Sequence, residues 1–204
     1  MLDLVDIPAG LLFLRDDRTG RRWHIDLPAF RLARYPVTRP DGLPLTDISW
    51  YESVALCNQL SKDAGLSPAY TIDGEDVHWD TTSTGYRLPT EAEWQHACTA
   101  GTPAYRYGPL DDIAWHAANS DGHLHPPGQK TPNPWGLHDM LGNQWEWCWD
   151  LYDPATYGPY RIFRGGGHAD APRSIGSTVR RRSHPTLKIE DLGLRLAQSI
   201  PTTP

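Results

Sequence analysis

The sequence predicts a single α+β domain with two main helices, small antiparallel sheets and much irregular loop. Two capping signatures each precede a segment with helical spacing, and strand-like segments lie near both ends of the chain. Gly 18 and Pro 19 among 204 residues exceed average usage but stay below the roughly 25–30% typical of disorder. A chain of this length can bury one sizeable core, and no repeat or linker divides it. We therefore expect residues 1–204 to form one domain.

The first part of the chain has the pattern of a β-hairpin. Gly10 to Leu14 is a short apolar run, and the following residues 16–20 are typical of a turn. His24 to Leu27 then alternates as a half-buried strand does.

Ser49 and Glu52 have the spacing of a capping box, in which each side chain binds the other's free backbone N–H at a helix start. They predict a helix over 50–64. Val54 and Cys57 recur at helical spacing, which places this cysteine on the buried face.

Thr90 and Glu93 repeat the capping signature and predict a second helix that ends before residue 101. Trp94, Ala97 and Cys98 form its inward stripe. The chain has only three cysteines, widely spaced, so neither a disulfide framework nor a Cys-x-x-Cys metal site is predicted. We expect them to be packed, reduced thiols.

The remaining segments are less regular. Residues 73–85 are polar and typical of a surface excursion, and 101–160 consist mostly of turn signals with Trp and His among them. Strands are predicted at 160–164, 178–182 and 192–197, the last with leucines alternating against Gly193 and Arg195.

The charge argues against nucleic acid as a partner, because 19 basic and 25 acidic residues give a net charge of −6. The basic cluster Arg180-Arg181-Arg182 is too short to overturn that expectation. No apolar stretch approaches the roughly 18 residues of a transmembrane helix, and the first residues do not resemble a secretory signal. We expect a cytoplasmic protein without membrane contact.

Four ordered motifs carry a family resemblance. They are Gly-Tyr-Arg-Leu-Pro-Thr-Glu-Ala-Glu-Trp at 85–94, Asn-Pro-Trp-Gly-Leu-His-Asp-Met-Leu-Gly-Asn-Gln-Trp-Glu-Trp at 133–147, Phe-Arg-Gly-Gly-Gly at 163–167 and Gly-Leu-Arg at 193–195. Together they resemble the formylglycine-generating enzyme, or sulfatase-modifying factor, family. The resemblance covers nearly the whole chain and implies a C-type-lectin-like fold. It does not by itself imply the enzyme activity, because one fold serves several functions.

The resemblance also shows what this sequence lacks. The family enzymes hold copper with two cysteines in the segment after the Arg-Gly-Gly motif, but residues 164–180 contain no cysteine. Copper and formylglycine generation are therefore not expected. His168 and Asp170 fall where the active enzymes carry copper-binding residues, and with His184 they are candidates for a remodelled metal site.

A second departure follows Val37 and Thr38, where family members usually continue with a helix. Here Pro40, Gly42 and Pro44 forbid a normal helix. The surface that such a helix would cover is expected to be open or remodelled.

The resemblance further implies a structural calcium site. The matching positions are Asp139 and Glu146 for side-chain ligands, with Gly142 and Gln144 contributing backbone carbonyls. The alternative is that the two carboxylates only accept backbone hydrogen bonds.

These observations favour a catalytically inactive protein-binding module, in one specific form an immunity protein that neutralises a cognate toxin or effector. The alternatives are a metal-dependent oxidoreductase that uses the remodelled site, and a protein that binds small ligands or carbohydrate. Nine Trp and nine Tyr against three Phe also suit an interface, because these rings bury much area and keep a polar group. Among the aromatics outside the motifs, the candidate binding residues are Trp23, Trp79 and Trp115, with Tyr152, Tyr157 and Tyr160 near the missing copper site.

Overall fold

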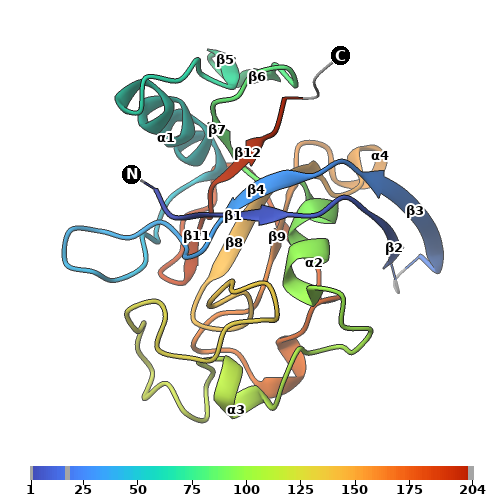
Figure 1. Ribbon diagram of the computed structural model, residues 1–204, viewed down its shortest axis with the longest axis vertical. Helices are drawn as coiled ribbons and strands as arrows, with labels where there is room; N and C mark the ends of the chain where they lie inside the picture. Colours follow the sequence, from blue (N-terminus) through green and yellow to red (C-terminus); the bar gives the residue numbers. More distant parts are fainter. Residues whose placement is uncertain (1, 17–18, 202–204) are drawn as a thin grey trace.

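The computed structural model describes residues 2–16 and 19–201, and their α+β architecture confirms the predicted class (Figure 1). Two four-stranded sheets, in the orders β1-β4-β12-β7 and β10-β9-β8-β11, are accompanied by the hairpins β2-β3 and β5-β6. The strands are β1 (Leu4–Ile7), β2 (Gly10–Asp16), β3 (Arg21–Leu27), β4 (Phe30–Ala33), β5 (Tyr70–Asp73), β6 (Asp76–Trp79), β7 (Tyr86–Arg87), β8 (Trp145–Leu151), β9 (Arg161–Arg164), β10 (Arg181–Ser183), β11 (Leu192–Gly193) and β12 (Ala197–Ser199). The helices are α1 (Trp50–Asp63), α2 (Glu91–Thr99), α3 (Leu110–Ile113) and α4 (Pro154–Tyr157), with a 3-10 turn at Pro172–Ser174.

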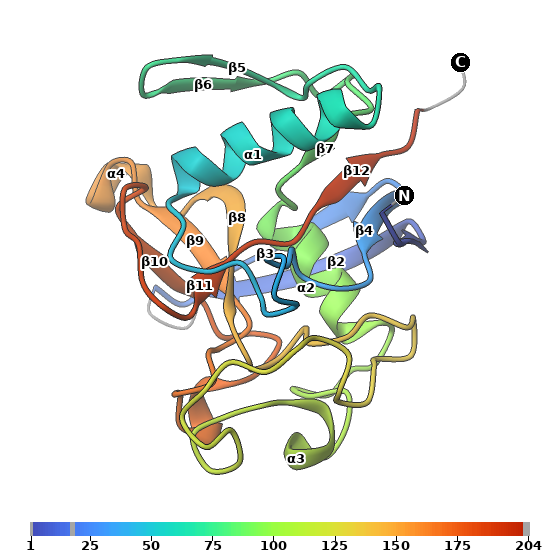
Figure 2. The same ribbon diagram turned by 90° about the vertical axis from the view of Figure 1, so that its left-hand side faces the viewer.

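The two four-stranded sheets lie between two ends of the molecule that differ in structure. Helix α1 lies between the β5-β6 hairpin and the body of the molecule, and the long loops around α3 form the opposite end (Figure 2). Helix α2 lies in the middle and contacts β2, β3, β8 and β9. No helix in residues 2–16 and 19–201 combines the length and apolar character that a membrane crossing needs.

Both predicted capping boxes are present. Ser49 accepts a hydrogen bond from Glu52 N and caps α1, and Thr90 does the same with Glu93 N for α2. Glu93 also binds Arg87 through two 2.7 Å hydrogen bonds, so the N-terminus of α2 is tied to β7. The capping signals located both helix starts because they depend on neighbouring residues only.

The predicted hairpin is confirmed as β2-β3, paired from Gly10 opposite Leu27 to Asp16 opposite Arg21. Part of its predicted turn, residues 17 and 18, lies outside the described residues. A second hairpin, β5-β6, spans residues 70–79 and overlaps the start of the polar segment 73–85, where no strand was predicted. Its strands do alternate, with Tyr70 and Ile72 on one and Val77 and Trp79 on the other, but they are only four residues long, and the polar residues that follow them hid this signal.

Two further strand predictions need correction. Strand β8 lies inside the segment 101–160, which was predicted as loop. The strand was not recognised because its first four residues are buried on both faces and therefore show no alternation of apolar and polar residues. The predicted strand 192–197 is divided between the sheets: β11 pairs with β8, in parallel rather than antiparallel, and β12 pairs with β4. Consequently Arg195 does not face solvent and is fully buried.

The motif residues meet in the core as buried ion pairs. Arg195 Nη2 lies 2.7 Å from Glu146 Oε1, and Trp94 Nε1 donates to Glu146 Oε2 at 2.7 Å. Arg164 Nη1 lies 2.9 Å from Glu91 Oε1. Each pair joins two motifs far apart in sequence, so these charged motif residues hold the scaffold together.

Candidate functional site

The six candidate aromatics separate into three places. Trp79 packs against Trp149, with ring centroids 5.7 Å apart, beside α1 and the β5-β6 hairpin. Trp115 stacks on His125 with a centroid distance of 3.7 Å. The remaining four, Trp23, Tyr152, Tyr157 and Tyr160, belong to one surface.

The loop 152–160 positions three of these rings. Tyr152 N donates to Tyr160 O at 2.9 Å and closes the loop. Asp153 accepts a hydrogen bond from Thr156 N and Pro154 occupies the first turn, so the sequence starts the short helix α4 at this point. Tyr157 then lies between the other two tyrosines, with centroid distances of 5.6 Å to Tyr152 and 5.9 Å to Tyr160.

Two arginines of the basic cluster interleave with these rings. Arg180 Cζ lies 5.5 Å from the Trp23 ring and 4.7 Å from the Tyr152 ring. Arg182 Cζ lies 4.5 Å from the Tyr152 ring and 3.9 Å from the Tyr157 ring. Figure 2 shows β10 and α4, which carry Arg182 and Tyr157, at the same side of the molecule. We call this surface the arginine–tyrosine face: Trp23, Tyr152, Tyr157, Tyr160, Arg180, Arg182 and the adjoining His184, whose ring lies 6.0 Å from Tyr160.

The three arginines of the cluster differ in their charge partners. Arg180 pairs with Glu91 at 2.5 Å and with Asp16 at 3.1 Å. Arg181 pairs with Asp170 at 3.1 Å. Arg182, in contrast, forms no ion pair with any carboxylate of residues 2–16 and 19–201. In the sequence the cluster is too short to indicate a nucleic-acid site, and its contacts with the tyrosine rings exist only in the folded chain.

An acidic residue beneath the face keeps its proton to unusually high pH. Asp150 Oδ2 accepts the backbone N–H of Glu91 at 2.5 Å, and burial, together with the charge of Glu91, raises the pKa of Asp150 to about 7. Because the unfolded chain has the ordinary carboxyl pKa of about 4, the folded state holds more protons between about pH 4 and pH 7. This carboxyl therefore contributes stability at low pH that is lost as the pH rises through 7.

We expect Asp150→Asn to reduce this loss, since the amide oxygen still accepts the Glu91 N–H while no charge develops. Urea unfolding at pH 5 and pH 8 measures the effect. The variant should lose less stability than the wild type between the two values, by about 1.4 kcal/mol for each pH unit between pH 5 and the folded pKa of about 7. Asp112→Asn, on an exposed side chain of α3, is the control. Equal pH dependence of wild type and Asp150→Asn would contradict the expectation.

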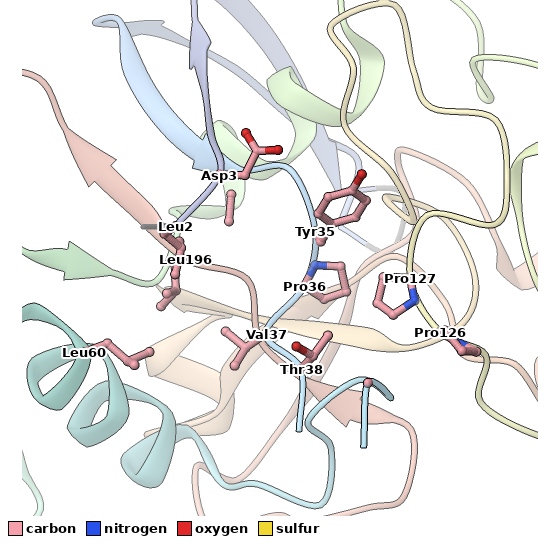
Figure 3. Close-up of a pocket in the computed structure, with 12 residues that line it drawn as sticks. Leu2, Asp3, Tyr35, Pro36, Val37, Thr38, Leu60, Pro126, Pro127 and Leu196 are labelled. Carbon is pink, nitrogen blue, oxygen red and sulfur yellow. The ribbon is translucent and has the colours of Figure 1, made fainter. Parts of the chain in front are cut away.

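A separate apolar pocket of about 470 Å³ lies near the chain's N-terminal strand. Figure 3 shows Leu60, Leu196 and Val37 on one side and Pro126 and Pro127 on the other. The pocket includes Val37, Thr38 and Gly42, so it lies where the predicted loss of a family helix opens the surface.

Two of the three residues of the candidate remodelled metal site are engaged in separate contacts. Asp170 accepts hydrogen bonds from Trp145 Nε1 at 2.7 Å and Gly167 N at 2.9 Å. His184 is exposed, with Nδ1 2.8 Å from Thr186 Oγ1. His168 is buried, and its Nδ1 has no hydrogen-bond partner among the described residues. Among the residues that the structure describes, no group of three or more His, Cys, Asp or Glu side chains is placed to hold a metal ion.

Cys57, Cys98 and Cys148 are all free and fully buried, in agreement with the prediction for the two helix cysteines. Burial raises the pKa of all three thiols above the ordinary range. Residues 164–180 contain no cysteine that could supply a thiolate ligand for copper. The raised pKa values keep the three buried thiols protonated, and a protonated thiol is a poor metal ligand. The donors present do not fit the copper site of the family enzymes.

The predicted calcium ligands are in part available. Asp139 is buried; its Oδ2 accepts Gly128 N at 2.7 Å, while its Oδ1 has no hydrogen-bond partner. Burial raises the pKa of Asp139. Glu146, in contrast, already accepts hydrogen bonds from Arg195 and Trp94. The unpartnered Asp139 oxygen is the feature that fits a cation, because burying such an atom costs free energy unless a partner satisfies it.

Comparison with known proteins gives a consistent result. Residues 39–200 match the model of the sulfatase-modifying factor enzyme 1-like domain. The chain is 29% identical to the chaperone protein LppX of Paenibacillus barcinonensis, with 71% of each chain covered. It is 30% identical to the formylglycine-generating enzyme of Streptomyces coelicolor over 67% of this chain, but it spans only 45% of that enzyme. Treponema denticola variable protein 1 has a solved structure with a TM-score of 0.90 at 26% identity, covering 97% of this chain and 95% of that one. The C-type-lectin-like fold that the motifs imply is thereby confirmed.

Proposed function

Because this chain belongs to the sulfatase-modifying factor enzyme 1-like domain family, we propose that it uses the family scaffold as a protein-binding module and not for formylglycine generation. The observation that carries the proposal is the arginine–tyrosine face. Tyr, Trp and Arg are the residue types enriched at binding hot spots, and here they are clustered at the surface.

The other features of the chain support this role. The charged motif residues are buried in ion pairs that stabilise the scaffold, and the copper-binding cysteines have no counterpart after Arg164. The relatives include a protein described as a chaperone and one described as a variable protein. These two descriptions are consistent with a binding role on this scaffold, which other relatives use for catalysis.

Photo-crosslinking tests the proposal. A photoreactive phenylalanine analogue replaces Tyr157 on the arginine–tyrosine face or, as the control, Asp112 on α3, which lies at the other end of the molecule in both Figure 1 and Figure 2. In the native cell we expect a defined protein to be captured from position 157 and not from position 112. Capture from position 112 alone, or formylglycine production by the purified protein, would refute the proposal.

The specific role that we propose, on the family resemblance alone, is that of an immunity protein whose partner is a toxin or effector made by the same cell. Expression of the crosslinked partner with and without this protein tests it. The partner should arrest growth only when this protein is absent, and a partner harmless in both cases would contradict the role.

We also propose that a calcium ion binds at Asp139 as a structural cofactor, with the carbonyls of Gly142 and Gln144 as the further oxygen ligands and Glu146 adjacent. A ligand that binds only the folded state raises its stability, so chelation with EGTA should lower the melting temperature. The variant Asp139→Asn keeps an acceptor for Gly128 N but removes the charge, and its melting temperature should not respond to EGTA. A wild-type melting temperature that is the same with EGTA and with added calcium would count against the site.

A further inference from the structure

We propose that the arginine–tyrosine face binds a carboxylate side chain, from Asp or Glu of the protein partner, and that Arg182 is the residue that anchors it. This inference rests on the proposed function and specifies the chemistry of the partner. It follows from the way Arg182 is held and from its charge environment.

The guanidinium of Arg182 is fixed before any partner arrives. Strand β10 holds the backbone, with Arg182 opposite Ile162 of β9. Its Cζ lies over two rings, 3.9 Å from the Tyr157 centroid and 4.5 Å from that of Tyr152, whose planes are 70° apart. A guanidinium held over aromatic rings still carries N–H groups at its edges, which can bind a planar acceptor.

These N–H groups have no acceptor in the described part of the chain: no hydrogen bond or ion pair of the Arg182 side chain is formed there. The contrast with its neighbours is clear, because Glu91 and Asp16 neutralise Arg180, and Asp170 neutralises Arg181. Within residues 2–16 and 19–201, Arg182 is therefore a preorganised positive charge without a counter-charge, and a carboxylate of the partner would supply one in bidentate geometry.

The surroundings favour a protein carboxylate over a nucleic acid. Binding a phosphate backbone requires several unpaired cations along a track, whereas the two neighbouring arginines are already paired. The net charge of −6 also repels a polyanion. Tyr157 lies next to the guanidinium, and its ring lies 5.9 Å from that of Tyr160. The expected target is therefore an acidic residue beside an apolar or aromatic one.

The experiment uses a library of random peptides displayed on phage and selected on the intact protein at low salt. Individual peptides are then measured against the wild type, Arg182→Gln, Arg182→Lys and the control Arg22→Gln. Arg22 is an exposed arginine of β3 and does not belong to the arginine–tyrosine face, so its replacement changes the net charge equally while Arg182 and the tyrosines stay in place. Thermal melts establish that each variant is folded.

We expect the selected peptides to be enriched in Asp or Glu. Their affinity should fall about tenfold or more in Arg182→Gln and remain unchanged in Arg22→Gln. Arg182→Lys should recover only part of the affinity, because an ammonium cannot make the stacked bidentate contact.

Three outcomes would overturn the inference: selected peptides without acidic residues, acidic peptides that bind Arg182→Gln as tightly as the wild type, or no enrichment above background. Binding of an oligothymidylate that is lost in Arg182→Gln would likewise overturn it in favour of nucleic acid. The proposed function fails separately. If a partner is crosslinked at position 157 but its affinity does not depend on Arg182, the carboxylate anchor is refuted while protein binding through this face stands.

Discussion

Replacement of Arg195 by methionine is expected to lower the free energy of unfolding by about 3–5 kcal/mol, the range for breaking a buried ion pair from one side. Arg195 and Glu146 side chains are 0% and 1% exposed, and Arg195 Nη2 lies 2.7 Å from Glu146 Oε1. The guanidinium also donates to the carbonyls of Ala33, Arg34 and His138. Methionine has a similar length but no donor, so it leaves the Glu146 charge and these three acceptors buried without this partner.

Denaturant unfolding monitored by tryptophan fluorescence measures the effect. The control is Arg31→Met, which breaks the pair between Arg31 and Asp6 at the surface, where the two side chains are 45% and 76% exposed. Exposed pairs contribute at most about 1 kcal/mol, so the control should remain close to the wild type. If Arg195→Met were as stable as Arg31→Met, the buried pair would not be the connection between motifs that we infer.

The substitution Gly193→Ala is expected to destabilise the protein by about 2–3 kcal/mol. A Cβ at this position would lie 2.1 Å from Leu45 O and 2.8 Å from Gln144 Oε1. Because the first of these atoms belongs to the backbone, the chain itself must move to relieve the overlap. This close approach explains why a glycine precedes Leu194 and Arg195 in the fourth motif.

Gly42→Ala is the matched control for Gly193→Ala. Gly42 has a φ of +83°, but a Cβ there would meet no atom within 4 Å. Its cost should therefore be only the conformational one, about 1 kcal/mol. Thermal or denaturant unfolding of both variants compares the two effects, and equal stability of the two would show that the contact between residues 193 and 45 is loose.

The elements predicted from the sequence are those with local signals. Ser49 and Glu52 identified the start of α1, and Thr90 and Glu93 that of α2, because a capping box satisfies backbone N–H groups within one helical turn. The hairpin β2-β3 was predicted from the apolar run Gly10 to Leu14, the turn residues after it and the alternation of His24 to Leu27, all of which are signals within one hairpin. Strand β8 was missed for the opposite reason, because burial on both faces removes the alternation.

The candidate site was predicted only in outline. Four of the six aromatics, among them Tyr152 and Tyr157, do come together, whereas Trp79 and Trp115 lie elsewhere. The partners that distinguish the site are Arg180 and Arg182, which contact these rings from positions more than twenty residues away in sequence, just before and within β10. No spacing rule relates such residues, so local patterns cannot assign the contact.

By itself, the sequence determined the fold class, the two helix starts, the family and the absence of a cysteine pair after Arg164. These depend on residue identities and on contacts within one turn or one hairpin. Only the tertiary structure decided which charges are neutralised: Arg195 and Arg164 are buried against glutamates, Arg180 and Arg181 are paired, and Arg182 alone of the basic cluster stays unpaired within the described residues. The physical reason is that the strength of an ion pair depends on the distance between its charges and on their burial. Both are set when the two sheets bring together strands that are distant in sequence.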